Sequence, residues 1–116
     1  MTHKRLLSFR YALQGIFSAA RHQANLKIQI LAAILAFLLA MLLEASPTEW
    51  LVIMICSGLV ISLEMINTAI EKTIDLISPE FSQQAGLIKD ISAGAVLIAA
   101  FFSLICGLII FIPKII

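Results

Sequence analysis

The chain has 116 residues, of which 61% are hydrophobic and only 13% are charged. Soluble domains are about 45–50% apolar and about 25% charged. A compact soluble fold of this length could not bury so many apolar side chains, and the excess would form surface patches larger than monomers tolerate. The composition therefore favours a membrane protein. It argues against a disordered chain, a disulfide-stapled secreted module and a protein that binds nucleic acid through a basic surface.

The basic residues are concentrated at the N-terminus, although the formal net charge is only +1. Five of them precede the first acidic residue: Lys4, Arg5, Arg10, Arg21 and Lys27. Because Lys and Arg are enriched on the cytoplasmic side of membrane proteins, the N-terminus is predicted to be cytoplasmic. No signal-peptide cleavage site is evident in this region, so we do not interpret it as a removable signal.

The first predicted element is an amphipathic helix over residues 5–22. Apolar side chains such as Leu6, Phe9 and Leu13 recur at intervals of three and four, while Arg10 and Arg21 fall elsewhere on the helical wheel. We expect this helix to lie on the cytoplasmic membrane surface, with its basic side toward anionic headgroups. A soluble cap packed on the membrane helices is the alternative.

Three charge-poor segments follow, at 28–43, 50–63 and 91–113. A membrane-spanning helix needs about 20 residues, which predicts helices over 25–43, 50–77 and 89–112, with Lys27 reaching the headgroups. The first two form a hairpin through the acidic link 44–49, which contains Pro47 and is followed by the interfacial anchor Trp50. The sequence thus predicts one all-α membrane domain over 1–116, an N-terminal surface helix plus three transmembrane helices.

The two cysteines, Cys56 and Cys106, both lie inside these apolar segments. No CxxC motif or Cys/His spacing points to a metal or redox centre. We therefore expect two buried thiols.

The carboxylates of the second span form one helical stripe. Polar residues recur there every three or four positions: Glu64, Asn67 or Thr68, Glu71 and Asp75. With Trp50 at the outer membrane boundary, the helical rise places Glu64 about 21 Å and Glu71 about 31 Å further in. Glu64 is then inside the hydrocarbon near its cytoplasmic edge, and Glu71 is at the water boundary.

A carboxylate at the predicted depth of Glu64 is costly, by about 2.5–3.5 kcal/mol on insertion scales, so such residues are usually functional or paired. One alternative is that Glu64 is simply protonated, or bonded to Gln29 across the helix hairpin. Another is that the stripe lines an ion or proton path. The first and third spans, however, carry no matching ionisable residues at mid-depth.

The third span is predicted to begin at Lys89 and Asp90, after a polar loop that starts at Ser78 and Pro79. A helix N-terminus with a nearby Lys suits phosphate oxygens, because free N–H groups and the cation both attract negative charge. From these two residues alone, the simpler interpretation is that Asp90 caps the helix and Lys89 reaches the headgroups.

Together these features resemble the bacterial diacylglycerol kinase and undecaprenol kinase family. The resemblance rests on the pattern Glu64-x-x-Asn67-Thr68-Ala69-Ile70-Glu71-x-x-x-Asp75, the downstream Lys89-Asp90, and the small residues Ala93-Gly94-Ala95-Val96. The segment Ser8-Phe9-Arg10-Tyr11-Ala12-x-x-Gly15-Ile16 is similar to the surface helix of that family. The resemblance covers essentially the whole chain, and the acidic motif is its most specific part.

The resemblance implies a homotrimeric, multi-pass lipid kinase of the bacterial inner (plasma) membrane, using ATP and Mg²⁺. It would transfer the γ-phosphate to the hydroxyl of undecaprenol or diacylglycerol at the cytoplasmic interface, and would have no nucleic-acid partner. By the family pattern, Glu64 is the catalytic base and Glu71 a metal ligand. The implied nucleotide-binding residues are Arg10, Tyr11, Asp75, Lys89 and Asp90, and the implied supporting residues are Asn25 and Asn67. A P-loop motif is not found, which agrees with this family.

One position departs from the family pattern. The family usually carries a Glu two residues before the position of Asn25, and that acid helps to hold the metal. Here the residue is Gln23, and Gln29 stands where a His is often found. An amide oxygen can ligate Mg²⁺ but adds no charge. A catalytically weakened or inactive membrane-binding homologue is therefore an alternative function, and a small ion-conducting oligomer is another.

Overall fold

The computed structural model describes residues 2–116, and that part of the chain forms four helices. They are α1 (Thr2–His22), α2 (Ala24–Leu42), α3 (Pro47–Ile77) and α4 (Gln83–Ile115). The last three are long and apolar enough to cross a membrane. The predicted all-α fold, with an N-terminal helix followed by three membrane helices, is confirmed.

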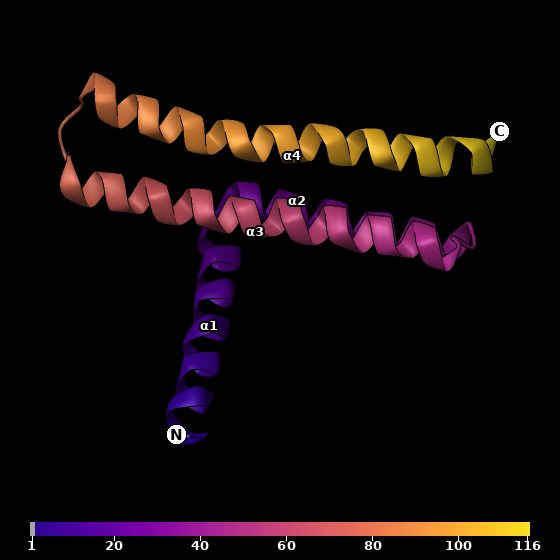
Figure 1. Ribbon diagram of the computed structural model, residues 1–116, viewed down its shortest axis with the longest axis horizontal. Coiled ribbons are helices and arrows are strands. Elements are labelled where there is room, and N and C mark those ends of the chain that lie inside the picture. Colours follow the sequence, from indigo (N-terminus) through magenta and orange to yellow (C-terminus); the bar gives the residue numbers. More distant parts are fainter. Residues whose placement is uncertain (1) are drawn as a thin grey trace.

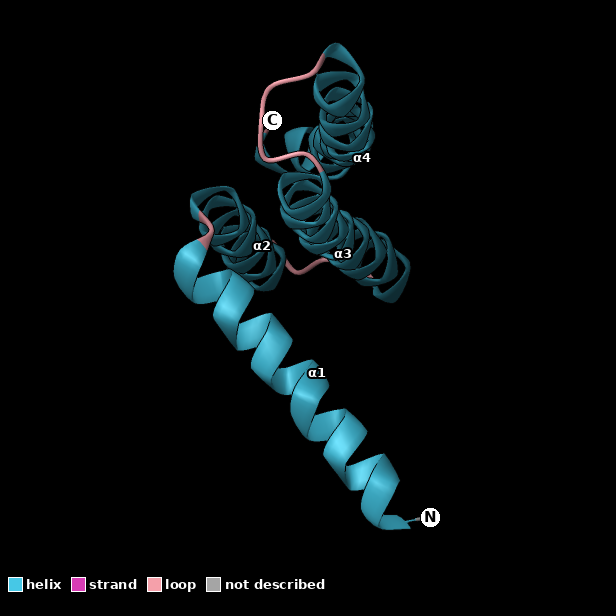
Figure 2. Ribbon diagram, turned by 90° about the vertical axis from the view of Figure 1, so that its left-hand side faces the viewer, coloured by secondary structure: helices cyan, strands magenta, loops and turns pink. Residues whose placement is uncertain are grey.

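The three membrane helices form a bundle in which α3 is the central member (Figures 1 and 2). Helices α3 and α4 run antiparallel along most of their length, while α2 packs against another side of α3. Seen end on, α2 and α4 lie on different sides of α3. Each polar side chain that α3 presents between its two neighbours therefore faces both of them.

Helix α1 leaves this bundle at a steep angle, starting from the beginning of α2 (Figure 1). Its apolar side chains, including Leu6, Phe9 and Phe17, are exposed. Within this single chain, helix α1 thus does not pack along the membrane helices. Its exposed apolar side chains are those that the amphipathic pattern assigned to a membrane surface.

The junction of α1 and α2 is a kink at one residue, Gln23. Its backbone is extended, with φ −108° and ψ 114°. Helical hydrogen bonds continue on both sides, because Gln23 N–H donates to Ala19 and Lys27 N–H donates to the Gln23 carbonyl. The two helices are therefore joined without a loop.

A compact turn closes the hairpin between α2 and α3. Glu44 adopts a left-handed conformation, with φ 54°. The Ala45 N–H donates to the Ala40 carbonyl at 2.9 Å, and the Glu44 N–H donates to the Met41 carbonyl at 3.4 Å. These two bonds form a Schellman motif, which satisfies carbonyl groups at the end of α2.

Helix α3 begins with a capping box, and an ion pair joins the same turn to the end of α4. The Ser46 hydroxyl accepts from the Glu49 N–H, and the Glu49 carboxylate accepts from the Ser46 N–H, while Pro47 occupies the first turn. Lys114 of α4 reaches the same carboxylate at 2.9 Å. Glu49 precedes the apolar segment, and its hydrogen bond to Lys114 holds the pKa of its carboxyl below the ordinary value.

Buried apolar side chains from all three membrane helices meet next to this ion pair. Ala40, Ile53 and Ile110 are buried against one another, one from each membrane helix. Phe37 and Trp50 pack beside them with ring centroids 5.9 Å apart. We call this region the Glu49 end of the bundle.

Helix α4 begins at Gln83, six residues before the predicted start at Lys89. The Ser82 hydroxyl accepts from the Ala85 N–H at 3.0 Å and caps the helix. The predictions that Lys89 and Asp90 stand at a helix N-terminus, and that Asp90 caps it, are therefore wrong. Gln and Ala favour helix strongly enough to continue through Gly86, whose cost is only about 1 kcal/mol.

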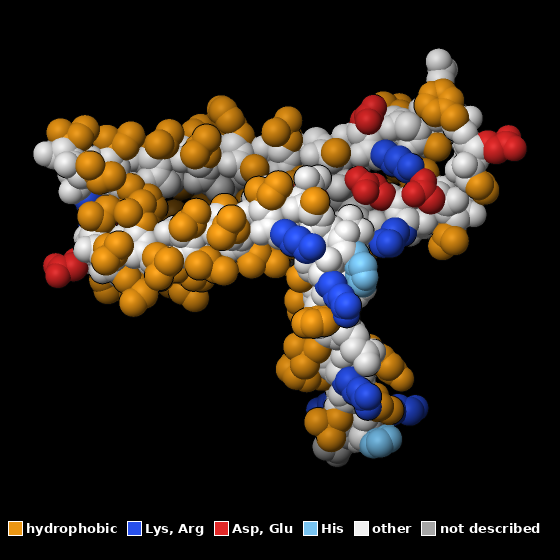
Figure 3. All heavy atoms as spheres, turned by 180° about the vertical axis from the view of Figure 1, so that it is seen from behind, with side chains coloured by type: hydrophobic (Ala, Val, Ile, Leu, Met, Phe, Trp, Pro, Cys, Tyr) orange, Lys and Arg blue, Asp and Glu red, His pale blue; other side chains and the backbone are white. Residues whose placement is uncertain are grey.

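Charged side chains gather at the opposite end of the bundle and on α1 (Figure 3). Apolar side chains cover most of the remaining length of the bundle on the face shown. The gathered charges lie where α3 and α4 meet their connecting loop, and we call this region the Glu71 end.

Candidate functional site

The polar stripe of α3 is buried in the bundle over one and a half turns. Glu64 and Asn67 are each 5% exposed, and Thr68 is 7% exposed. The Thr68 hydroxyl donates to the Glu64 backbone carbonyl at 3.0 Å, so its own polar group is satisfied within the helix. Glu64 and Asn67, by contrast, carry carboxyl and amide groups that make no hydrogen bond to the helix backbone.

These side chains line a groove of about 250 Å³ between the three membrane helices. Glu64, Asn67 and Glu71 of α3 face it, together with Asn25 and Gln29 of α2. The opposite wall comes from α4 and is small or apolar, formed by Ala93, Val96, Leu97 and Ala100. The groove therefore has an acidic side, an amide side and an apolar side.

Asn67 stands between two carboxylates in this groove. Its amide Nδ2 donates to Glu71 Oε1 at 3.1 Å, and Glu64 precedes it by one turn in the lining of the same groove. Its carbonyl oxygen, Oδ1, is buried and has no hydrogen-bond partner among residues 2–116. A buried acceptor without a partner costs about 1–3 kcal/mol and calls for an explanation. A ligand that offers a proton or a cation to Oδ1 would supply one.

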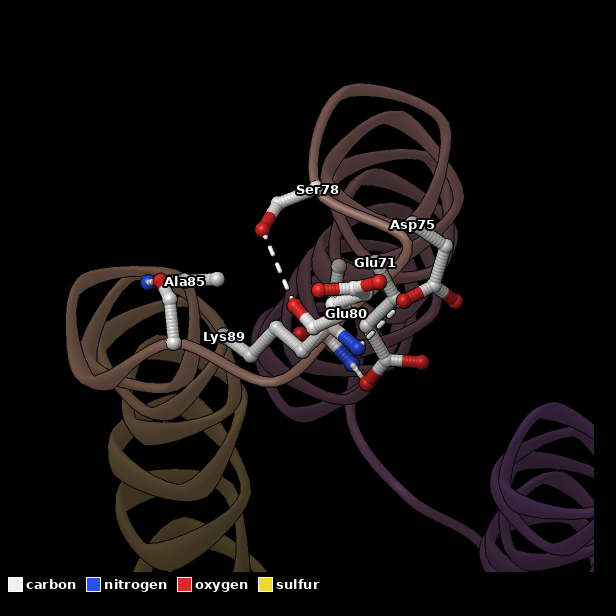
Figure 4. Close-up of polar contacts among 8 residues, drawn as sticks. Glu71, Asp75, Ser78, Glu80, Ala85 and Lys89 are labelled. Carbon is white, nitrogen blue, oxygen red and sulfur yellow. Dashed lines mark hydrogen bonds and ion pairs between the residues drawn. The ribbon is translucent and has the colours of Figure 1, made fainter.

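One turn further along α3, an ion pair joins the stripe to α4. Lys89 Nζ lies 2.5 Å from Asp75 Oδ1, and both side chains are partly exposed. Figure 4 shows Lys89 extending from α4 toward Asp75, with Glu71 beside them. The predicted nucleotide-binding residues Asp75 and Lys89 are thus in contact, next to the groove and on its more open side.

The remaining predicted residues are spread more widely. Asn25 lines the groove. Gln23 is two residues earlier, at the kink between α1 and α2, and is half-buried but not part of the lining. Asp90 is exposed on α4, and Arg10 and Tyr11 are exposed on α1. Within this single chain, the structure does not bring these last three residues to the groove.

Sequence reasoning included Ala93 and Val96 in the family pattern but did not place the α4 wall in the site. Val96 is 7% exposed and packs into the groove. The small residues at Ala93 and Ala100 are the available signal, because small side chains let a third helix approach the acidic stripe. Gln29 was considered only as a partner for Glu64. It lines the groove, but no hydrogen bond joins the two within residues 2–116.

The donor set of the groove fits Mg²⁺. Glu64, Glu71, Asn67 and Asn25 offer carboxylate and amide oxygens, which are the ligands that hard cations prefer. Across residues 2–116, no group of three His, Cys, Asp or Glu side chains could form an all-protein cage. Mg²⁺ typically uses one or two carboxylates and completes its shell with water and substrate phosphates. The Asn67 oxygen of this set, Oδ1, is buried and has no other partner among residues 2–116.

Comparison with known proteins identifies the family of this chain. The sequence profile of prokaryotic diacylglycerol kinase matches residues 10–111. The undecaprenol kinase of Bacillus subtilis (strain 168) is 42% identical over 107 residues, covering 92% of this chain and 87% of that protein.

Two more distant relatives are diacylglycerol kinases. The one from Synechocystis is 36% identical over 109 residues, covering 93% of this chain and 62% of that protein. The one from Escherichia coli (strain K12) is 30% identical over 95 residues, covering 82% of this chain and 78% of that protein. The profile match spans every residue of the groove, and the chain belongs to the prokaryotic diacylglycerol kinase family of lipid kinases.

Proposed function

We propose that this protein transfers the γ-phosphate of ATP to the hydroxyl of undecaprenol or diacylglycerol, with Mg²⁺ as cofactor. The observation that carries the proposal is the groove in which Glu64, Asn67 and Glu71 converge beside the Asp75–Lys89 pair. Phosphoryl transfer needs alignment and charge neutralisation more than covalent chemistry, so a few carboxylates and one lysine suffice.

Glu64 is the base in this mechanism. It is the most buried carboxylate of the stripe and lies beside the apolar α4 wall. A lipid hydroxyl can reach it while the lipid tail stays in the membrane. The carboxylate takes the hydroxyl proton as the oxygen attacks the γ-phosphorus, and ADP leaves with the bridging oxygen.

Glu71 and Lys89 face the nucleotide. Glu71 lies two helical turns from Glu64, about 10 Å along α3, and its carboxylate would hold the metal together with Asn67. Bound Mg²⁺ supplies neutralisation of the phosphate charge. The Lys89 ammonium can exchange its contact with Asp75 for a phosphate oxygen, because both groups are partly exposed and their pairing is weak.

The enzyme works at the cytoplasmic face of the bacterial inner membrane in this proposal, as a homotrimer. The N-terminal basic residues support that orientation through their cytoplasmic bias. A trimer would allow the exposed Arg10, Tyr11 and Asp90 of one chain to meet the groove of another.

The deciding experiment is transfer of labelled phosphate from ATP in mixed micelles that contain either undecaprenol or diacylglycerol. We expect transfer to one or both lipids at millimolar Mg²⁺, and no transfer by Glu64→Gln. The variant Ser62→Ala, on an exposed face of α3, is the matched control and should keep wild-type activity. Failure of the wild-type protein to phosphorylate either lipid would contradict the proposal.

A second candidate function rests on Gln23, an uncharged residue at the position where the family pattern usually has a Glu. In that case the protein binds nucleotide and lipid without turnover. The change Gln23→Glu separates the two functions, because an added carboxylate should lower the Mg²⁺ concentration for half-maximal activity by about tenfold. If wild-type protein is inactive and Gln23→Glu is active, the second function is the right one.

A further inference from the structure

The two ion pairs at opposite ends of the bundle fix the register of α3 against α4. Glu49 pairs with Lys114 at one end, and Asp75 pairs with Lys89 at the other. Between them, α3 advances from residue 49 to 75 while α4 goes back from 114 to 89, so the two helices keep step to within one residue. Any position on α3 therefore has a defined partner on α4.

The buried core obeys the same register. Ile53 and Ile110 are in contact, and each lies four residues inward from the Glu49–Lys114 pair. Two ion pairs and one core contact thus indicate the same register between the antiparallel helices α3 and α4.

This register places Cys56 opposite Gly107, one residue from Cys106. Cys56 lies seven residues inward from Glu49, and Cys106 lies eight residues inward from Lys114. Both line one apolar cavity of about 540 Å³, which adjoins the site groove at Gln29. Both are free thiols, and both are half-buried.

The neighbours of the two cysteines allow α3 and α4 to approach closely. Ser57 follows Cys56 on α3, Gly107 follows Cys106 on α4, and both line the same cavity. Small residues permit short distances between membrane helices. Facing Cα atoms of helices whose axes are about 8–10 Å apart are roughly 3.4–5.4 Å apart, which overlaps the range that a disulfide needs.

The geometry points to a reversible disulfide between Cys56 and Cys106, formed by a membrane-soluble two-electron oxidant of the quinone class. The two thiols lose two protons and two electrons as the S–S bond forms, and the quinone takes up both pairs to become the quinol. The bond would tie α3 to α4 in the half of the bundle away from Glu64 and Glu71.

The experiment treats the reduced full-length protein, in detergent micelles, with duroquinone, whose fully substituted ring offers no position for thiol addition. We expect free thiols to fall from two to zero per chain, with the intact mass of the monomer lower by about 2 Da for the two hydrogens lost. Dithiothreitol should restore both thiols. Cys56→Ser and Cys106→Ser should each keep one free thiol and an unchanged mass.

A register control keeps two thiols but moves one of them. The double variant Cys106→Ser/Ser103→Cys places the α4 thiol one turn away, about 4.5 Å along the helix, in the same cavity. It should form the bridge at least tenfold more slowly than the wild type.

Three results would overturn the inference. The first is a wild-type protein that keeps both thiols when native but loses them to duroquinone in sodium dodecyl sulfate. The second is a product linked between two chains, and the third is equal rates for the wild type and the register control. None of these readouts depends on kinase activity, so failure here would leave the proposed lipid kinase function standing.

Discussion

The two ends of the bundle are built from the same helices but satisfy their polar groups very differently. At the Glu49 end, the carboxylate of Glu49 has both a capping partner and Lys114, next to buried Ala40, Ile53 and Ile110. At the Glu71 end, a groove replaces the packed core, and the buried Asn67 Oδ1 has no partner among residues 2–116. Satisfied polar groups and a buried apolar cluster mark the end that holds the bundle together. An unsatisfied acceptor in a groove marks the end that can take a ligand.

The largest expected effect is loss of activity on removing the Glu71 charge. Glu71→Gln keeps the shape of the side chain and the chance to bond Asn67, but it cannot neutralise a metal. We expect phosphate transfer to fall about 100- to 1,000-fold, measured with labelled ATP, while thermal unfolding stays unchanged. Glu80→Gln is the matched control, because it removes an exposed acid from the nearby loop. If Glu80→Gln lost as much phosphate transfer as Glu71→Gln, a charge in the groove would matter no more than a charge on the surface.

The opposite pattern is expected at the Glu49 end. Ile110→Ala removes packing against Ile53 and Ala40. Because lipid is as apolar as the lost side chain, only packing is forfeited, and we expect a loss of about 2 kcal/mol, at the low end for buried positions. Ile109→Ala, at a side chain that is 67% exposed, should cost much less. Unfolding in detergent titrations measures both. At a temperature where Ile110→Ala stays folded, its activity should match the wild type.

A smaller effect is expected for the ion pair beside the groove. Asp75 and Lys89 are partly exposed, so Asp75→Asn should change stability by less than about 1 kcal/mol. If Lys89 contacts phosphate, Lys89→Gln should raise the KM for ATP more than Asp75→Asn does. Initial rates at varied ATP measure this difference. If both variants lose more than about 1 kcal/mol of stability but keep the wild-type KM for ATP, the pair serves the fold instead.

The smallest effect is a pH dependence at Glu49. Because Lys114 holds the pKa of Glu49 below its ordinary value of 4.5, the charged form stabilises the folded state above that pH. This contribution is lost as the pH falls through the lowered pKa. The difference in melting temperature between the wild type and Glu49→Gln should therefore be largest near neutral pH and vanish in stronger acid. A difference that grows below pH 4.5 would contradict the ion pair.

Much of the fold followed from hydrophobic segment length, because the bilayer demands about 20 apolar residues per helix. The period of the acidic stripe likewise identified Glu64, Asn67 and Glu71, which do share one groove. Helix ends were harder to predict. Gln83 and Gln84 looked like loop because they are polar, yet both have good helix propensity and follow a serine cap.

The α4 wall and the placement of α1 depend on packing that no local pattern encodes. Val96 faces the groove and Leu97 lines it too, although both belong to a continuous apolar run. For Arg10 and Tyr11, the family pattern predicts nucleotide contact, whereas the fold of one chain leaves them on a projecting helix. The role of these two residues stays a prediction.

Because α1 and α2 join at Gln23 without a loop, the number of residues before the kink determines how α1 is rotated about its own axis. Helical hydrogen bonds are present immediately before and after this residue, so there is no flexible segment that could accommodate an added residue. One inserted alanine would turn α1 by about 100° about its own axis relative to α2. The exposed face of Leu6, Phe9 and Phe17 would then turn away from the side that the amphipathic pattern predicts to enter the bilayer. The number of residues between this face and Asn25 thus determines the rotation of α1 relative to α2, and with it the direction of the apolar face relative to the groove.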